Sequence, residues 1–308
     1  MADKNTKVGW IGIGRMGYAM AERLVNGGAD LTIWNRTRSK AEPLAGLGAK
    51  IAGKLVDLAA CDVVFVMVAT VDDVAEVVNG PQGLLSGKQT PKLVVECSSI
   101  SLEGSAELRA KLAARGAQML AAPVSGNPKV IQAGRLSFVC SGPRAAFDAA
   151  LPFMRMIGPG VSYVGEGELS RIVKICHNVF LGVVTQSLSE ITVLAQKAGV
   201  PRHAFLDFIN QSVMGSTFSR YKTPALVNLD FKVTLPPKLL RKDLDLGLDA
   251  ARKFEVPMPL CSITRDLVQA LIGQGMDDED FAKLLVLQAM ASGLALSPEN
   301  VPVTDGLS

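Results

Sequence analysis

The chain has 308 residues, of which 48 % are hydrophobic, so it is long enough for two domains with sizeable cores. The formal net charge is only +3 and the basic residues are scattered, which disfavours nucleic acid as a partner. Five cysteines without CxxC spacing and only two histidines disfavour a disulfide framework, a zinc site and a histidine-based metal centre.

The N-terminal segment MADKNTK is polar and leads directly into an apolar strand, so we expect no signal peptide. Apolar runs such as 179–184 are shorter than the roughly 20 residues that a membrane-spanning helix needs. Together with the cysteine content, these features predict a cytoplasmic protein without a membrane partner.

The first half of the chain alternates short β-branched runs with amphipathic stretches. The expected strands are 7–13, 30–34, 63–68, 93–97, 118–121 and 136–140, and helical stretches such as 16–27 and 103–115 lie between them. This alternation predicts a doubly wound, mainly parallel sheet of the Rossmann type.

A long helix is expected at 169–198, closed by Gly199 and Pro201, and the pattern remains helical beyond it. Breaks are expected at Pro224, Pro236, Pro237, Pro257 and Pro259. The tail after Ser297 is rich in Pro, Asp, Gly and Ser and is expected to be loose. We therefore predict an NADP-binding Rossmann domain at 1–165 and an all-α domain for substrate binding and dimerisation at 166–308.

The segment that follows the first expected strand has the pattern GxGxxG, with glycines at 12, 14 and 17. Gly12 permits a tight turn, Gly14 lets the backbone approach a pyrophosphate, and Gly17 lets the following helix pack close to the strand. The N-terminus of that helix faces the negative charge of the phosphates. Because strand, helix and a second strand follow on schedule, the pattern indicates a dinucleotide site rather than a glycine-rich turn without a ligand.

The residues after the second strand bear on the choice of cofactor. NAD enzymes usually place an acidic residue there for the ribose hydroxyls, whereas this chain has Asn35-Arg36-Thr37-Arg38. A guanidinium and a hydroxyl bind a 2′-phosphate that an aspartate repels, so NADP is favoured over NAD, although an ordinary polar loop has the same composition. The predicted cofactor-binding residues of this half are Gly12, Ile13, Gly14, Arg15, Met16, Asn35, Arg36, Thr37 and Val68.

Lys174 and Asn178 are four residues apart on the long expected helix, so they share one face of it. Lys174 lies in the apolar stretch IVKIC near the expected domain boundary. A lysine in such surroundings can exchange protons near neutral pH, and a nearby Lys242 would act in the same direction. The residue types alone also fit a lysine that extends its ammonium group to water.

Four separated segments, in order, carry a family resemblance: IGIGRMG at 11–17, APVSG at 122–126, KICHN at 174–178 and KDL at 242–244. On these segments the whole chain resembles the β-hydroxyacid dehydrogenase family, which includes 3-hydroxyisobutyrate dehydrogenase, tartronate semialdehyde reductase and the glyoxylate/succinic semialdehyde reductases. The resemblance implies that Lys174 is the acid/base, with Asn178 one turn further on. It also implies that Ser125 and Gly126, together with Asn178, bind the substrate and hold its carboxylate, and that Ser99 and Lys242 lie near the cofactor.

The chain departs from the family at positions that adjoin the expected substrate site. The bulkier segment NPKVI at 127–131 replaces the usual glycine-rich continuation of APVSG, and Ala121 replaces the usual acidic residue. His177 replaces an asparagine, and it either assists the chemistry or packs as a neighbour of Asn178. The resemblance therefore leaves the substrate open.

The sequence predicts an oxidoreductase that transfers a hydride between NADP(H) and a small β-hydroxyacid or semialdehyde, without a metal. An imine reductase-like enzyme and a non-catalytic NADP-binding sensor are the alternatives. The lysine at 174, which imine reductases generally lack, disfavours the first, and the presence of both Lys174 and Lys242 disfavours the second. The apolar helices at 169–198 and 281–296 predict a homodimer or homotetramer.

Overall fold

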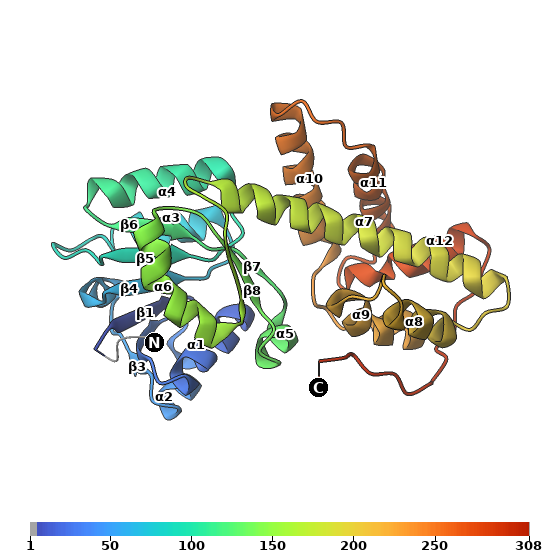
Figure 1. The fold of residues 1–308 in the computed structure, drawn as a ribbon, viewed down its shortest axis with the longest axis horizontal. Helices are drawn as coiled ribbons and strands as arrows, with labels where there is room; N and C mark the ends of the chain where they lie inside the picture. The colour runs from blue at the N-terminus through green and yellow to red at the C-terminus, as the bar shows by residue number, and fades with distance from the viewer. Residues whose placement is uncertain (1–4, 308) are drawn as a thin grey trace. The chain divides into compact units, whose positions relative to one another are not determined.

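The computed structural model describes residues 5–307 and divides them into two compact units, one ending at Lys174 and one beginning at Ile175 (Figure 1). Helix α7 (Leu169–Lys197) runs through this division. The domain boundary expected near residue 165 precedes this helix, whereas the division between compact units lies inside it.

The N-terminal unit is built on a six-stranded parallel sheet. Its strands are β1 (Lys7–Ile11), β2 (Asp30–Trp34), β3 (Lys50–Ile51), β4 (Val63–Val66), β5 (Leu93–Glu96) and β6 (Gln118–Ala121), in the order β3-β2-β1-β4-β5-β6. The strand order reverses between β1 and β4, so the expected doubly wound Rossmann sheet is confirmed. The short strand β3 was not expected, because it contributes only two paired residues.

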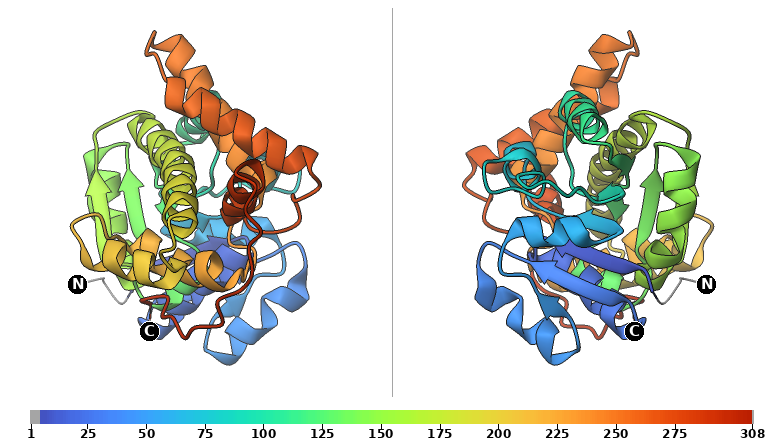
Figure 2. Two further views of the ribbon diagram at one scale, coloured as in Figure 1. Left: turned by 90° about the vertical axis from the view of Figure 1, so that its right-hand side faces the viewer. Right: turned by 90° about the vertical axis from the view of Figure 1, so that its left-hand side faces the viewer.

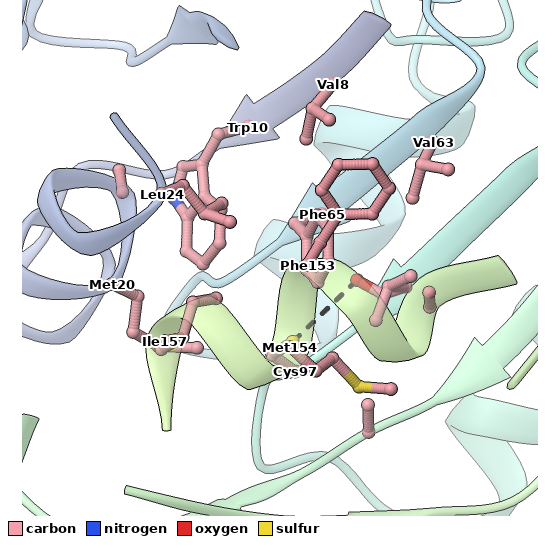
Figure 3. Close-up of a cluster of buried hydrophobic side chains, with 14 of the residues drawn as sticks. Val8, Trp10, Met20, Leu24, Val63, Phe65, Cys97, Phe153, Met154 and Ile157 are labelled. Atoms are coloured by element: carbon pink, nitrogen blue, oxygen red, sulfur yellow. Dashed lines mark hydrogen bonds between the residues drawn. The ribbon is translucent and has the colours of Figure 1, made fainter. Parts of the chain in front are cut away.

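Helices cover the sheet and enclose two apolar clusters. They are α1 (Arg15–Asn26), α2 (Glu42–Gly46), α3 (Val71–Asn79), α4 (Leu102–Ala114) and α6 (Arg144–Ile157). Successive strand residues point to opposite faces, so Trp10 and Phe65 belong to one cluster while Ile11 and Val64 belong to the other. Figure 3 shows the first cluster, in which the stacked rings of Trp10 and Phe65 have centroids 5.4 Å apart.

A second sheet corrects one expectation. Strands β7 (Val124–Ser125), β8 (Ser137–Cys140) and β9 (Gly160–Tyr163) form a separate three-stranded sheet, in which β7 and β8 are antiparallel (Figure 2). The strand expected at 136–140 exists but does not join the parallel sheet. An alternating apolar pattern specifies a strand and its buried face, whereas the choice of pairing partner depends on residues remote in sequence.

In the second unit, the described residues from Ile175 onward contain helices and loops without strands, as expected. Its remaining helices are α8 (Arg202–Gln211), α9 (Thr217–Asn228), α10 (Pro237–Lys253), α11 (Pro259–Gly273) and α12 (Leu284–Ala291). Pro224 lies inside α9 instead of breaking it. A proline costs a helix one hydrogen bond and some strain, and the burial of Ala225, Leu226 and Val227 offsets that cost.

The C-terminal tail is not loose, contrary to expectation. The buried guanidinium of Arg202 donates to the carbonyl of Ser297 at 2.6 Å. The backbone N–H groups of Arg202 and His203 donate to the carboxylate of Glu299 at 2.7 and 2.9 Å. Asn228 donates to the carbonyl of Val301 at 2.9 Å. Composition indicates low intrinsic order, but these side chains supply specific partners for the tail.

Helix α7 is long and apolar enough to cross a membrane by length and composition, with a mean hydropathy of 1.3 over an 18-residue window. The uninterrupted apolar runs in the sequence are shorter than this window, so they did not indicate the high mean hydropathy of the helix. Half of that window (50 %) is buried inside the structure, which is also typical of core helices in soluble proteins. Length and composition are therefore weak evidence for a membrane span here.

Candidate cofactor and catalytic site

Each glycine of the GxGxxG turn has a distinct steric role. Gly12 has a φ of +98°, and a Cβ there would lie 2.1 Å from the carbonyl oxygen of Met67. A Cβ on Gly17 would lie 1.9 Å from the carbonyl oxygen of Gly12, so this position fixes how closely α1 packs on the turn. A Cβ on Gly14 would meet no atom within 4 Å. The fold therefore requires glycine at 12 and 17, whereas Gly14 leaves space beside an exposed backbone.

The start of α1 suits an anion. Gly14 is the N-cap residue, and the first turn of α1 carries no acidic side chain. Gly14 and Arg15 are exposed and Met16 is half-buried, while Ile13 is buried. Because the first N–H groups of a helix have no partner within it, this turn can bind the phosphates of a dinucleotide.

Asn35 connects the glycine turn to the loop after β2. Its side-chain oxygen accepts a hydrogen bond from the backbone N–H of Ile13 at 2.8 Å, and its Nδ2 donates to the carbonyl of Thr37 at 2.8 Å. The Asn35 side chain therefore holds the two loops together. The sequence indicated Asn35 as a cofactor contact, but its bridging role depends on a partner 22 residues away in the chain.

Arg36 and Thr37 are both exposed beyond this bridge. The guanidinium of Arg36 lies 3.7 Å from a carboxylate oxygen of Asp73 and 3.9 Å from one of Glu76, both on α3. The Arg36 side chain is 76 % exposed, so these pairs contribute little to stability. The guanidinium can exchange these partners for a phosphate at little cost.

The loops after β4 and β5 complete the candidate cofactor edge. The backbone N–H of Val68 donates to the hydroxyl of Ser98 at 3.0 Å, and Ser99 is exposed beside it. Val68 also lies next to the glycine turn, because a Cβ on Gly12 would come within 3.0 Å of its side chain. Gly12 and Val68 follow the carboxyl ends of β1 and β4, between which the strand order reverses, and Ser99 follows the carboxyl end of the next strand, β5.

The segment after APVSG forms a short helix, α5 (Pro128–Gln132). The side chain of Asn127 caps it by accepting from the N–H of Val130 at 3.1 Å. Val130 and Ile131 are 4 % and 0 % exposed, so their bulk fills the core instead of lining a substrate site. Ser125, at the end of β7, is half-buried and Gly126 is exposed, with a φ of +146°.

Lys174 is half-buried in the first turns of α7, at the end of the N-terminal unit. In the helical unit, buried Asn178 donates from Nδ2 to a carboxylate oxygen of Asp243 at 2.8 Å. Its Oδ1 lies 3.0 Å from Nδ1 of His177. The other oxygen of Asp243 lies 3.1 Å from the ammonium of Lys242.

Asp243 thus joins Asn178 to Lys242, a role that its position in the KDL segment did not reveal because Asn178 is 65 residues away in sequence. Within the described residues, no group of three or more His, Cys, Asp or Glu side chains could hold a metal ion.

The glycine geometry yields a test of the nucleotide site. Gly14→Ala should leave the melting temperature within about 2 °C of wild type, because the new Cβ meets nothing, but should weaken NADPH binding at least about tenfold by filling the approach to the backbone. Gly17→Ala is the matched control and should lower the melting temperature. Thermal melts and fluorescence titration measure both. Wild-type NADPH affinity in Gly14→Ala would show that the phosphates lie elsewhere.

Both compact units match family models of known dehydrogenases. Residues 7–165 match a family model described as the NAD binding domain of 6-phosphogluconate dehydrogenase. Residues 168–288 match a model described as NAD-binding of NADP-dependent 3-hydroxyisobutyrate dehydrogenase. The two matches cover the Rossmann sheet and most of the helical unit.

Individual proteins resemble the chain over nearly its whole length. Glyoxylate/succinic semialdehyde reductase 2, chloroplastic, of Arabidopsis thaliana is 30 % identical over 90 % of this chain and 78 % of its own. The 2-(hydroxymethyl)glutarate dehydrogenase of Eubacterium barkeri is 28 % identical over 96 % and 99 %. The solved structure of Mycobacterium tuberculosis 3-hydroxyisobutyrate dehydrogenase with L-serine aligns with a TM-score of 0.79, 26 % identity and coverage of 93 % and 99 %.

Proposed function

Because this chain belongs to the β-hydroxyacid dehydrogenase family of NAD(P)-dependent oxidoreductases, we propose that it interconverts a small β-hydroxyacid and its semialdehyde with NADP(H), using Lys174 as general acid/base. One observation carries the proposal. Lys174 follows, by one helical turn, the residue Arg171, which is hydrogen-bonded to the carboxyl end of β5 and to the loop after it. That edge of the sheet is where a dinucleotide binds in doubly wound folds.

The residues at the sheet edge fit a nicotinamide dinucleotide. The start of α1, with open space at Gly14, would hold the pyrophosphate, and Arg36 and Thr37 would hold a 2′-phosphate. Val68 and Ser99 would line the site further along the edge. The cofactor, when bound, supplies the hydride chemistry.

Lys174 performs the proton transfer at its Nζ. In oxidation, the neutral amine takes the proton of the substrate hydroxyl, and in reduction the ammonium returns a proton to the developing alkoxide. Ser125 and the exposed backbone of Gly126 orient the substrate carboxylate. Asn178 donates one amide hydrogen to Asp243, which leaves the second for a substrate oxygen.

The first experiment is a turnover panel. The purified chain, with NADPH or NADP⁺, should act on small acids that carry an aldehyde or hydroxyl at the β or γ carbon. Absorbance at the nicotinamide band measures the rate. Activity confined to cyclic imines would instead assign an imine reductase, and cofactor binding without turnover of any compound would assign a sensor.

The preference for NADP is tested at Arg36. Wild-type protein should bind NADPH more tightly than NADH, and Arg36→Ala should weaken NADPH binding roughly tenfold by removing a charge-assisted contact worth about 1.4 kcal/mol. NADH binding should change little. Arg144→Ala, which removes another exposed arginine paired with an aspartate, is the matched control. Equal affinities for the two cofactors in the wild type would contradict the preference.

The role of Lys174 is tested by paired substitutions. Lys174→Ala should reduce turnover by about 10²–10⁴-fold, the usual contribution of a positioned acid/base, while NADPH binding is retained. Lys174→Arg should not restore turnover, because a guanidinium does not release its proton at working pH. Lys197→Ala, on the same helix, should keep full activity. Near-normal turnover in Lys174→Arg would exclude the assigned role.

The homodimer or homotetramer, the cytoplasmic location and the absence of nucleic-acid and membrane partners remain predictions from the sequence. The physiological substrate within the β-hydroxyacid and semialdehyde class is the question that the turnover panel addresses first.

A further inference from the structure

A buried ion pair joins the start of α7 to the parallel sheet. Arg171 and Glu96 are 2 % and 0 % exposed, and Nη2 of Arg171 donates to Oε2 of Glu96. Glu96 is the last residue of β5, and Arg171 lies in the first turn of α7, three residues before Lys174. The two partners are 75 positions apart in sequence, so the pair fixes a tertiary contact.

The guanidinium is bound in three directions. Besides Glu96, its Nη1 donates to the carbonyl of Ser98 at 2.6 Å, and its Nε donates to the hydroxyl of Ser105 at 3.1 Å. The other carboxylate oxygen of Glu96 accepts from the backbone N–H of Ser98 at 2.7 Å. The orientation of the side chain is therefore set by the loop after β5 as well as by charge.

The same loop forms part of the candidate cofactor edge. The hydroxyl of Ser98 accepts from the N–H of Val68, and Ser99 is the next residue. One continuous set of hydrogen bonds thus runs from Val68 through Ser98 to Arg171. Lys174 follows on the same helix within the N-terminal unit.

Further contacts attach the start of α7 to the N-terminal unit, and some of them join the Arg171 network, because the Ser105 hydroxyl that accepts from Arg171 donates to the carboxylate of Glu168. Arg109 binds the carboxylate of Glu168 at 2.7 Å and the carbonyl of Gly167 at 2.9 Å. Ser170 donates to the carbonyl of Ala121 at 3.2 Å and receives a bond from Ser141 at 2.8 Å. The Ser170 contacts do not involve Arg171 or Glu96 and also attach α7 to the sheet, so the Arg171–Glu96 pair is one of several anchors of the helix.

A buried ion pair also contributes little to the net stability of a protein. The loss of hydration of two charges largely cancels their attraction, and well-packed apolar side chains stabilise a protein as well or better. What a guanidinium adds is a planar fork whose bonds fix direction. Here that fork is bonded to the loop that bears the candidate cofactor contacts.

We propose that Arg171 and Glu96 are positioning residues, which set the distance and direction between Lys174 and the cofactor-binding loop at Val68 and Ser98–Ser99. The inference rests on the proposed role of Lys174. It predicts that proton and hydride transfer depend on the bond geometry of this pair, and not only on its presence.

Arg171→Lys tests this directly. Lysine keeps the charge but cannot donate along the three fixed directions. We expect kcat to fall about 10- to 100-fold, the usual cost of misplaced reacting groups, while the dissociation constant for NADPH stays within about threefold. The kinetic isotope effect with substrate deuterated at the carbinol carbon should rise, because the chemical steps become rate-limiting. A purely structural role would lower stability without moving this isotope effect.

Lys222→Arg is the matched control, because Lys222 and Asp280 form another buried ion pair, 3 % and 1 % exposed, in which the Lys222 ammonium donates to Thr234 and Asp280 and to none of the candidate site residues. Lys222→Arg should lower the melting temperature. The isotope effect should not change, and neither should kcat when it is calculated from the concentration of protein that binds NADPH. A second variant, Arg171→Met combined with Glu96→Leu, replaces the pair by apolar side chains and should fold but turn over slowly.

The outcomes separate this inference from the proposed function. If Lys174→Ala is inactive while Arg171→Lys and the double variant retain wild-type kcat and isotope effect, the positioning role is overturned and the acid/base role stands. If Lys174→Ala is fully active, the proposed function itself fails. If neither Arg171 variant folds while Lys222→Arg does, the pair is a stability element and the inference is likewise overturned.

Discussion

Among the glycines of the described residues, the two that leave the least room for a side chain lie where β1 turns into α1. The carbonyl of Gly12 occupies the space that a side chain at position 17 would need, and the carbonyl of Met67 occupies the space beside Gly12. This contact sets the distance from α1 to the first and fourth strands. It therefore also sets where the unpaired N–H groups of α1 emerge, and every later element of the candidate cofactor site is arranged around that position.

Within residues 5–307, a buried ion pair in each unit connects segments that are remote in sequence. Arg171 and Glu96 connect α7 to β5, whereas Lys222 and Asp280 connect α9 to the segment before α12. Burial lowers the pKa of Lys222, and Asp280 opposes that effect. In both pairs, hydrogen bonds from neighbouring groups satisfy the carboxylate. Such pairs specify one arrangement of the chain, since a shifted contact would leave a buried charge without a partner.

Much of the candidate site could be predicted from the residues, but several roles could not. The GxGxxG spacing predicted the turn and its helix because both depend on neighbours in sequence. The bridge made by Asn35, the burial of Val130 and Ile131, and the contact of Asn178 with Asp243 depend on partners that the sequence does not reveal. The family resemblance, and not spacing, singled out Lys174 among the lysines of the chain.

By itself, the sequence determined the order of strands and helices, the parallel sheet and the helical second half, because periodicity and glycine spacing act over a few residues. Only the tertiary structure decided that 137–140 belongs to a separate sheet, that Pro224 is tolerated within α9, and that the polar tail is bound through Arg202 and Glu299. In each case a long-range hydrogen bond or buried contact outweighed the local preference of the chain. Such contacts exist only once remote segments meet, so local patterns carry no record of them.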